Sequence, residues 1–227
     1  MESLLKTKLF NDGYISFNLK ELDEEIYNNL ESIFPPDNLK PEMFKNLIHA
    51  VRKDLNYPYD RQSLMNKKFE DLEIIKNDII NKFANKSDLP GSDCDQIWYY
   101  DWLFNPNSEN NPFDKIVKPI FNKFYNNELK AANSQVTMYN DGCYLNNHRD
   151  GNGEYSGDKC CVILIYLSTD YQKGKGGELV LSIDKENELF VEPVYGNVAI
   201  MDFTKHDAYH RVQLVDGYNR YCFISFC

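Results

Sequence analysis

The sequence from Gln135 to the end consists of short β-type runs separated by turn residues, and this pattern restricts the fold most. The run from Cys160 to Leu167 is apolar or aromatic at every position, as expected of a central strand buried on both faces. The runs at 178–183 and 197–203 follow glycine or proline, and the last two runs, 210–215 and 220–226, are joined by Asp216-Gly217. Strands at this spacing with no helix between them predict an antiparallel sandwich or jelly roll.

Residues 1–130 are helical in character. Asn18 followed by Glu21 predicts a capped helix over residues 18–34, and an apolar stripe predicts another over residues 69–84. Asn111-Pro112 predicts the start of a third. We expect these helices to be a support region for a catalytic core at residues 131–227, the two together forming one domain.

An aromatic stretch lies inside the helical region. Residues 93–104 include Trp98, Tyr99, Tyr100 and Trp102. This pattern favours a strand that packs its rings into a core, and a surface that contacts a substrate is the alternative. His49 lies on a stretch with helical character and is expected to be an ordinary packed or exposed side chain.

The charge of the chain excludes several partners. With 25 Lys+Arg against 35 Asp+Glu the formal net charge is -10, which disfavours binding to nucleic acid or anionic membranes. No apolar run reaches the roughly 18 residues that a membrane span needs, and the amino terminus lacks the pattern of a secretory signal. We therefore expect a monomeric protein of the cytoplasm, with access to the nucleus as well.

The six cysteines show no C-x-x-C spacing. We expect them to be reduced and mostly buried, and to take no part in the chemistry.

Three of the four histidines lie in the last third of the chain. His148 and Asp150 are two residues apart, so in an extended chain both side chains point the same way. Such a pair arises often by chance and gains weight from a second histidine at the start of a later strand. His210 begins the run 210–215, and His206 is its competitor for that position.

Arg220 begins the last run, and the face of the sheet to which its side chain points depends on the loop before this run. If runs 210–215 and 220–226 form a hairpin with the three-residue loop 215–217, His210 and Arg220 share one face. A two-residue loop would place them on opposite faces. The three-residue case groups the more apolar residues with them, namely Val212, Leu214, Cys222, Ile224 and Phe226. A buried guanidinium is costly without an anion, and a ligand carboxylate would supply one.

Two histidines and a carboxylate with open coordination positions are what non-haem Fe(II) oxygenases use. An arginine ten residues past the second histidine could then receive the far carboxylate of 2-oxoglutarate. Residues 135–226 resemble the catalytic core of the Fe(II)- and 2-oxoglutarate-dependent dioxygenases, in particular the prolyl 4-hydroxylases. The matching pieces, in order, are Tyr139 with Gly142, HRD at 148–150, IYLS at 165–168, GGEL at 176–179, P-x-x-G at 193–196, Phe203, HRV at 210–212, and Gly217 with Arg220.

The resemblance implies a double-stranded β-helix and a set of site residues. His148, Asp150 and His210 would be the metal ligands and catalytic centre. Arg220 would bind the distal carboxylate of 2-oxoglutarate, assisted by the hydroxyl of Tyr166. Tyr139 would line the pocket near the metal. The co-substrate residues would therefore be Arg220, Tyr166 and Tyr139.

Two positions depart from the family pattern. Ser168 stands where the family usually has asparagine, and Phe226 stands where many oxygen-sensing members have tryptophan. These changes leave the iron and co-substrate assignments intact and bear on the substrate pocket. Lys159 and Phe226 are the candidate substrate contacts.

The resemblance is strongest to the cytoplasmic, oxygen-sensing prolyl hydroxylases, which act on hypoxia-inducible factors or, in protists, on a ubiquitin-ligase adaptor subunit. It implies an enzyme that uses Fe(II), 2-oxoglutarate, dioxygen and ascorbate to hydroxylate a proline of a protein substrate. A hydroxylase of a free amino acid or other small molecule is the closest alternative. A jelly-roll binding module without enzymatic activity is the second.

Overall fold

The protein is described here from a computed structural model, which covers residues 1–50, 64–65, 67–83, 96–103, 108–126, 129, 133–149, 161–182, 188–204 and 209–227. The strands in these ranges are β1 (Tyr14–Asn18), β2 (Asn46–Ala50), β3 (Gln96–Asp101), β4 (Asn133–Tyr139), β5 (Tyr144–His148), β6 (Cys161–Tyr166), β7 (Leu179–Ser182), β8 (Glu188–Val191), β9 (Asn197–Asp202), β10 (Tyr209–Val212) and β11 (Arg220–Phe226). The helices are α1 (Glu2–Asp12), α2 (Leu19–Leu22), α3 (Glu24–Ile33), α5 (Phe69–Phe83) and α6 (Lys118–Phe124), with a 3-10 turn η1 (Pro41–Met43) and a π-helical turn η3 (Phe113–Val117).

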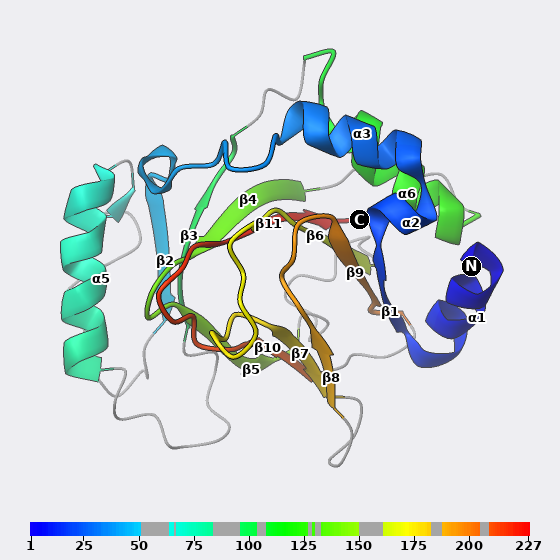
Figure 1. Ribbon diagram of the computed structural model, residues 1–227. Coiled ribbons are helices and arrows are strands. Elements are labelled where there is room, and N and C mark those ends of the chain that lie inside the picture. The colour runs from blue at the N-terminus through cyan, green and yellow to red at the C-terminus, as the bar shows by residue number, and fades with distance from the viewer. Residues whose placement is uncertain are drawn as a thin grey trace.

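The eleven strands form one antiparallel sheet folded into two layers (Figure 1). The strand order is β1-β9-β6-β11-β4-β3-β5-β10-β7-β8, and β2 pairs with β3 outside this path. β3 pairs with both β4 and β5, so it joins the layer that ends in β1 to the layer that ends in β8. This near-closed arrangement confirms the jelly roll predicted from the sequence.

β6 shows why the apolar run at 160–167 becomes a central strand. All of its residues are buried, because its two faces pack against different partners. Leu164 and Tyr166 point between the two layers, into an interior cluster. The buried members of this interior cluster are Tyr14, Val162, Leu164, Tyr166, Leu179, Leu181, Val191, Ala199, Met201 and Cys222.

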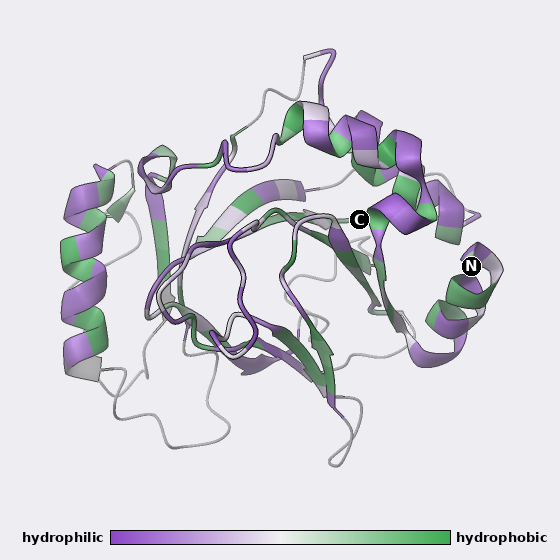
Figure 2. Ribbon diagram, viewed as in Figure 1, coloured by the Kyte–Doolittle hydropathy of each residue, from purple (hydrophilic) through white to green (hydrophobic). Residues whose placement is uncertain are grey.

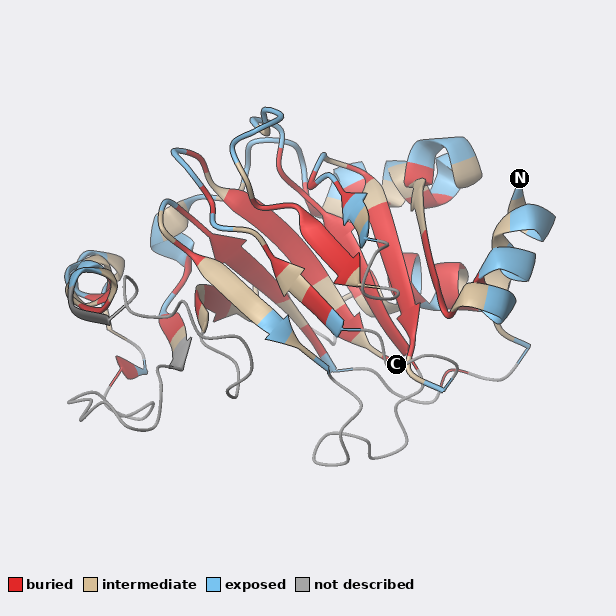
Figure 3. Ribbon diagram, turned by 90° about the horizontal axis from the view of Figure 1, so that it is seen from below, coloured by how far each residue is buried: buried red, intermediate tan, exposed pale blue. Residues whose placement is uncertain are grey.

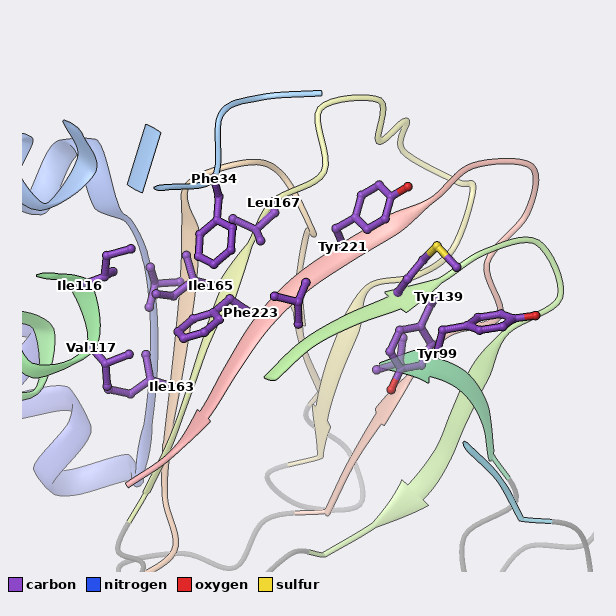
Figure 4. Close-up of a cluster of buried hydrophobic side chains, with 14 of the residues drawn as sticks. Phe34, Tyr99, Ile116, Val117, Tyr139, Ile163, Ile165, Leu167, Tyr221 and Phe223 are labelled. Atoms are coloured by element: carbon purple, nitrogen blue, oxygen red, sulfur yellow. The ribbon is translucent and has the colours of Figure 1, made fainter. Parts of the chain in front are cut away.

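The other face of the same layer is covered by helices. Ile163 and Ile165 of β6 and Phe223 of β11 lie beneath Ile116 and Val117 of η3 (Figure 4). Hydrophilic and hydrophobic residues alternate along the helices (Figure 2), and buried residues concentrate in the strands (Figure 3). The helical region therefore supports the layer that carries β11. The division into a support region and a core at residue 130 remains a prediction.

Three details of the amino-terminal region differ from expectation. β1 and β2 belong to the sheet as well as β3, so residues before 130 supply strands beyond the one predicted at 93–104. His49 lies on β2 opposite Ile97, not on a helix. The helix expected over residues 18–34 is two helices, because Asp23 caps α3 after Asn18 has capped α2.

The predicted hairpin between residues 210–215 and 220–226 is wrong. β10 pairs with β5 and β7, whereas β11 pairs with β4 and β6, so the two strands lie in different layers. The connection at 213–219 crosses between the layers, and Leu214 is 58% exposed instead of interior. His210 and Arg220 are nevertheless both buried. The connection thus differs from the prediction, while the burial of both side chains agrees with it.

None of the helices in the described ranges combines the length and apolar character needed to cross a membrane.

Candidate active site

His148 and His210 lie side by side on neighbouring strands. They are opposite each other in the β5–β10 pairing, and their ring centroids are 4.1 Å apart. His210 is buried, at 4% exposure. The register between β5 and β10 shifts next to this pair, since Val212 faces Leu145. An extra residue in one strand re-aims the side chains beside it, and here it does so at the end of β5.

The backbone also sets the orientation of the His148 ring. Its Nδ1 lies 2.9 Å from the carbonyl oxygen of Asn146. A carbonyl can only accept, so Nδ1 carries the proton and Nε2 keeps its lone pair. A histidine held in this way is the form that binds a metal ion.

The third candidate ligand, Asp150, lies outside the described residues, as do His206 and Lys159. The described ranges contain no group of three or more His, Cys, Asp or Glu side chains able to hold a metal. The pairing of His148 with His210 is therefore observed, and the role of Asp150 and the choice of His210 over His206 remain predictions.

Arg220 is the largest fully buried side chain, at 1% exposure. Its Nε donates a hydrogen bond to the carbonyl of Gly177 over 2.7 Å. Within the described part of the chain, Nη1 and Nη2 have no hydrogen-bond partner. A buried guanidinium with two unused nitrogens is costly, and a bidentate carboxylate would satisfy both.

Two tyrosines surround this guanidinium. Its Cζ lies 4.8 Å from the ring centroid of Tyr139 and 5.1 Å from that of Tyr166. Tyr139 is opposite Arg220 in the β4–β11 pairing, and Tyr166 is opposite Cys222 in the β6–β11 pairing. Three neighbouring strands thus deliver all three side chains to one place.

The hydroxyl of Tyr166 is a second unused donor. It is buried and has no hydrogen-bond partner among the described residues. Burial raises the pKa of Tyr166 above its ordinary value, although the nearby Arg220 charge acts in the opposite direction. The hydroxyl therefore stays protonated at neutral pH and can donate to an anion beside Arg220.

A row of aromatic rings leads away from this place along β3. Trp98 stacks on Tyr139 at 5.8 Å, Tyr100 meets Trp98 edge-on at 5.9 Å, and Trp102 meets Tyr100 edge-on at 5.4 Å. Tyr100 is buried and Trp102 is 52% exposed. The expectation of a buried strand holds for Tyr99 and Tyr100, while Trp102 ends the row at the surface.

Phe226 and the cysteines complete the sequence candidates. Phe226 is partly buried at the edge of the interior cluster. Cys143, Cys161, Cys222 and Cys227 are free and buried, as expected, and Cys94 and Cys160 lie outside the described residues. Burial raises the pKa of the Cys222 thiol to about 12, so this neighbour of Arg220 stays neutral.

Sequence reasoning missed how Arg220 is held. Gly176 and Gly177 follow the turn at 173–174 and both have positive φ, 69° and 80°. Nothing in the local sequence pairs the Gly177 carbonyl with Arg220, because the two residues meet only after the crossing at 213–219 is folded.

Residues 134–227 match the 2OG-Fe(II) oxygenase superfamily. The match covers less than half of the chain. The match spans every residue placed above except the aromatic row on β3. No curated protein matches the sequence.

Solved structures of similar fold extend over nearly the whole chain. A prolyl-4-hydroxylase of Pseudomonas putida has a TM-score of 0.56 at 13% identity, covering 100% of this chain and 97% of the other. A Trichoplax adhaerens prolyl hydroxylase, in complex with a hypoxia inducible factor peptide fragment, has a TM-score of 0.57 at 12% identity, covering 99% and 87%. A 2OG-Fe(II) oxygenase family protein of Burkholderia pseudomallei has a TM-score of 0.52 at 12% identity, covering 100% and 89%. At these identities the likeness shows the fold.

The matched superfamily consists of oxygenases that use Fe(II), 2-oxoglutarate and O2. The described residues are suited to bind two of these, Fe(II) and 2-oxoglutarate. The unused donors of Arg220 and Tyr166 suit the distal carboxylate of 2-oxoglutarate, and the adjacent imidazoles suit Fe(II).

Proposed function

We propose that this oxygenase is a prolyl 4-hydroxylase that acts on a protein substrate. The observation that carries the oxygenase assignment to particular residues is the buried, unsatisfied pair of donors on Arg220 and Tyr166. A protein interior does not leave a guanidinium half-paired without a reason, and a dicarboxylate co-substrate is a sufficient one.

In this proposal Arg220 binds the distal carboxylate through Nη1 and Nη2, and the Tyr166 hydroxyl adds a third hydrogen bond. Tyr139 closes the pocket beside the guanidinium. His148 and His210 hold the metal through imidazole nitrogens, with Asp150 as the third ligand. When bound, Fe(II) and 2-oxoglutarate supply the activation of O2 that hydroxylation requires.

The histidine pair keeps its geometry through the backbone. The Asn146 carbonyl fixes the His148 tautomer, and the β5–β10 pairing fixes its distance from His210. Apolar neighbours from the interior cluster exclude water from the far end of the pocket, where Tyr166 and Leu179 are both buried. A dry, preorganised pocket strengthens every charge interaction within it.

The prolyl substrate is supported by the aromatic row on β3. Proline-rich segments bind in aromatic-lined grooves, where the apolar pyrrolidine ring packs against the faces of Tyr and Trp. Trp98, Tyr100 and Trp102 provide such a row from Tyr139 to the surface. The fold is also shared with prolyl hydroxylases, one of them solved with a hypoxia inducible factor peptide fragment. That likeness supports a peptide substrate and a role in oxygen sensing, which we include in the proposal.

The test incubates the purified protein with Fe(II), ascorbate, 2-oxoglutarate and a cytosolic protein extract, followed by mass spectrometry of peptides and free metabolites. New +16 Da shifts on proline, absent with His148→Ala, are expected. The Trp102→Ala variant should need more peptide for half-maximal hydroxylation and no more 2-oxoglutarate. Shifts confined to free metabolites would establish the small-molecule alternative. No turnover of 2-oxoglutarate under any condition would favour a binding module.

A further inference from the structure

The orientation of the Arg220 guanidinium depends on two successive carbonyls of the Gly176-Gly177 turn. Gly177 accepts from Arg220 Nε at 2.7 Å. The preceding carbonyl, that of Gly176, accepts from the hydroxyl of Tyr218 at 2.8 Å. Two side chains that are two residues apart in sequence thus hold adjacent peptide groups of one turn.

The turn and the crossing segment are joined along their backbones as well. Gly177 N–H donates to Gln213 O at 3.2 Å, and Gln213 N–H donates to Glu178 O at 3.0 Å. Asp216 N–H donates to Lys175 O at 2.9 Å. These backbone hydrogen bonds hold the segment leading to Tyr218 against residues 175–178 independently of any side chain.

The fit between the two segments leaves no spare room. A Cβ added at Gly177 would overlap the Tyr218 hydroxyl and lie 3.2 Å from Arg220 Cδ. Gly177 also has a φ of 80°, which side-chain-bearing residues rarely adopt. The close approach of Tyr218, Gly177 and Arg220 therefore requires glycine at this position.

The ring of Tyr218 is held from its other side. It is 9% exposed and meets the ring of Tyr171 edge-on at 6.0 Å. The Tyr171 hydroxyl donates to Glu178 Oε1 at 2.7 Å, away from Gly176. Tyr171 thus packs against Tyr218 without bonding the carbonyl that Tyr218 bonds.

We infer that Tyr218 is a positioning residue for 2-oxoglutarate recognition, acting through Gly176 and Gly177 on Arg220. This inference rests on the proposed role of Arg220. Nε is the single guanidinium nitrogen with a hydrogen bond inside the described chain, so the Gly177 carbonyl is the hydrogen-bonded anchor for the direction of Nη1 and Nη2. A carboxylate bound through both Nη atoms needs that plane to be fixed.

If Tyr218 positions Arg220, loss of its hydroxyl should weaken the binding of 2-oxoglutarate selectively. Removing the Tyr218 hydroxyl frees the Gly176 carbonyl and loosens the turn that orients Arg220. The distal carboxylate would then be bound less well, whereas the 2-oxo acid end at the metal would be unaffected. A 2-oxo monocarboxylic acid, which lacks the distal group, should not respond to the change.

The experiment measures binding by calorimetry to the full-length protein loaded with Mn(II), a metal that does not start turnover. Tyr218→Phe should weaken 2-oxoglutarate binding about three- to tenfold, the usual effect of one lost hydrogen bond, and leave 2-oxobutyrate binding unchanged. Tyr171→Phe is the matched control and should leave both affinities unchanged. Gly177→Ala places a methyl group against the Tyr218 hydroxyl and should weaken 2-oxoglutarate binding in the same selective way.

Arg220→Ala separates failure of the inference from failure of the proposed function. If Arg220→Ala loses the preference for 2-oxoglutarate over 2-oxobutyrate and Tyr218→Phe keeps it, the positioning role is wrong. An equal loss for both acids in Tyr218→Phe also overturns it, since that indicates a general structural defect. If the wild-type protein shows no preference that depends on Arg220, the proposed co-substrate site itself is wrong.

Discussion

At the scale of single residues, the proposed chemistry depends on donors that have no partner in the described part of the chain. Arg220 and Tyr166 lie on neighbouring strands in a buried interior, with Arg220 Cζ 5.1 Å from the Tyr166 ring centroid. Unsatisfied buried donors lower the stability of the free protein, and this cost is offset when a ligand accepts their hydrogen bonds. This trade of stability for binding is typical of functional sites.

Tyr166→Phe tests the smaller of the two contributions. We expect the 2-oxoglutarate concentration for half-maximal succinate formation to rise about three- to tenfold, because one hydrogen bond is lost. The free energy of unfolding should stay the same or increase, since a buried unsatisfied hydroxyl is removed. An unchanged 2-oxoglutarate requirement would remove Tyr166 from the site.

The residues of the proposed site could be named from the sequence, and their surroundings could not. His148, His210, Arg220, Tyr166 and Tyr139 were named from spacing and family resemblance. The Asn146 carbonyl behind His148 and the Gly177 carbonyl behind Arg220 could not. Both depend on a register shift or a crossing that no local pattern encodes.

At the scale of elements, α5 is attached through a buried ionic network. Lys76 is 3% exposed, and its ammonium donates to Glu73 at 3.1 Å, to the Asn140 side chain at 3.1 Å and to the Asp141 carbonyl at 2.9 Å. Tyr99 of β3 also donates to Glu73. The network holds the turn that leads into β5 and therefore to His148.

Lys76→Met should lower the free energy of unfolding by about 2 to 4 kcal/mol, because Glu73 loses its cation and two oxygens lose their donor. Denaturant unfolding measures this change. Lys6→Met is the control, since Lys6 forms an exposed pair with Glu2 at 3.4 Å and should change the value by less than about 0.5 kcal/mol. Similar values for the two variants would show that the network is dispensable.

The cap of α3 gives a pH-dependent prediction. Lys123 and the Ile26 N–H bond to Asp23 and lower the pKa of its carboxyl. A lowered folded-state pKa contributes stability above the unfolded pKa, about 3.9, and loses it as pH falls through the folded value. Asp23→Ala should cost about 1 kcal/mol at pH 7.

Thermal or urea unfolding of Asp23→Ala and Asp23→Asn as a function of pH checks this. Asparagine keeps the capping acceptor and loses the ion pair, so its deficit at pH 7 should be the smaller one. The difference between wild type and Asp23→Asn should shrink below pH 4. A difference that persists or grows in acid would contradict the assigned pKa direction.

Strand positions were predictable at this scale, and strand partners were not. Apolar runs and turn residues place β6, β7, β9, β10 and β11 close to their observed positions. The hairpin between β10 and β11 failed because loop parity presumes that consecutive strands pair. In a double-layered fold consecutive strands can change layers, and the face of each side chain then follows from burial.

At the scale of the molecule, the two layers contribute different residues to the proposed site. The layer with β11, β6 and β9 is covered by helices and contributes Arg220 and Tyr166. The layer with β5 and β10 contributes the histidines. The proposed metal ligands and the proposed co-substrate anchor thus come from opposite layers. The jelly roll was predictable from strand density, whereas the contribution of β1 and β2 to the sheet was hidden in helical surroundings.

The affinity of the metal-loaded protein for 2-oxoglutarate without O2 is the most direct test of this account. The account predicts that binding requires the metal and that Arg220→Ala weakens it at least about thirtyfold, because one partner of a buried charge pair is lost. Binding of 2-oxoglutarate that is unchanged in Arg220→Ala, or that is equally strong without metal, would contradict it.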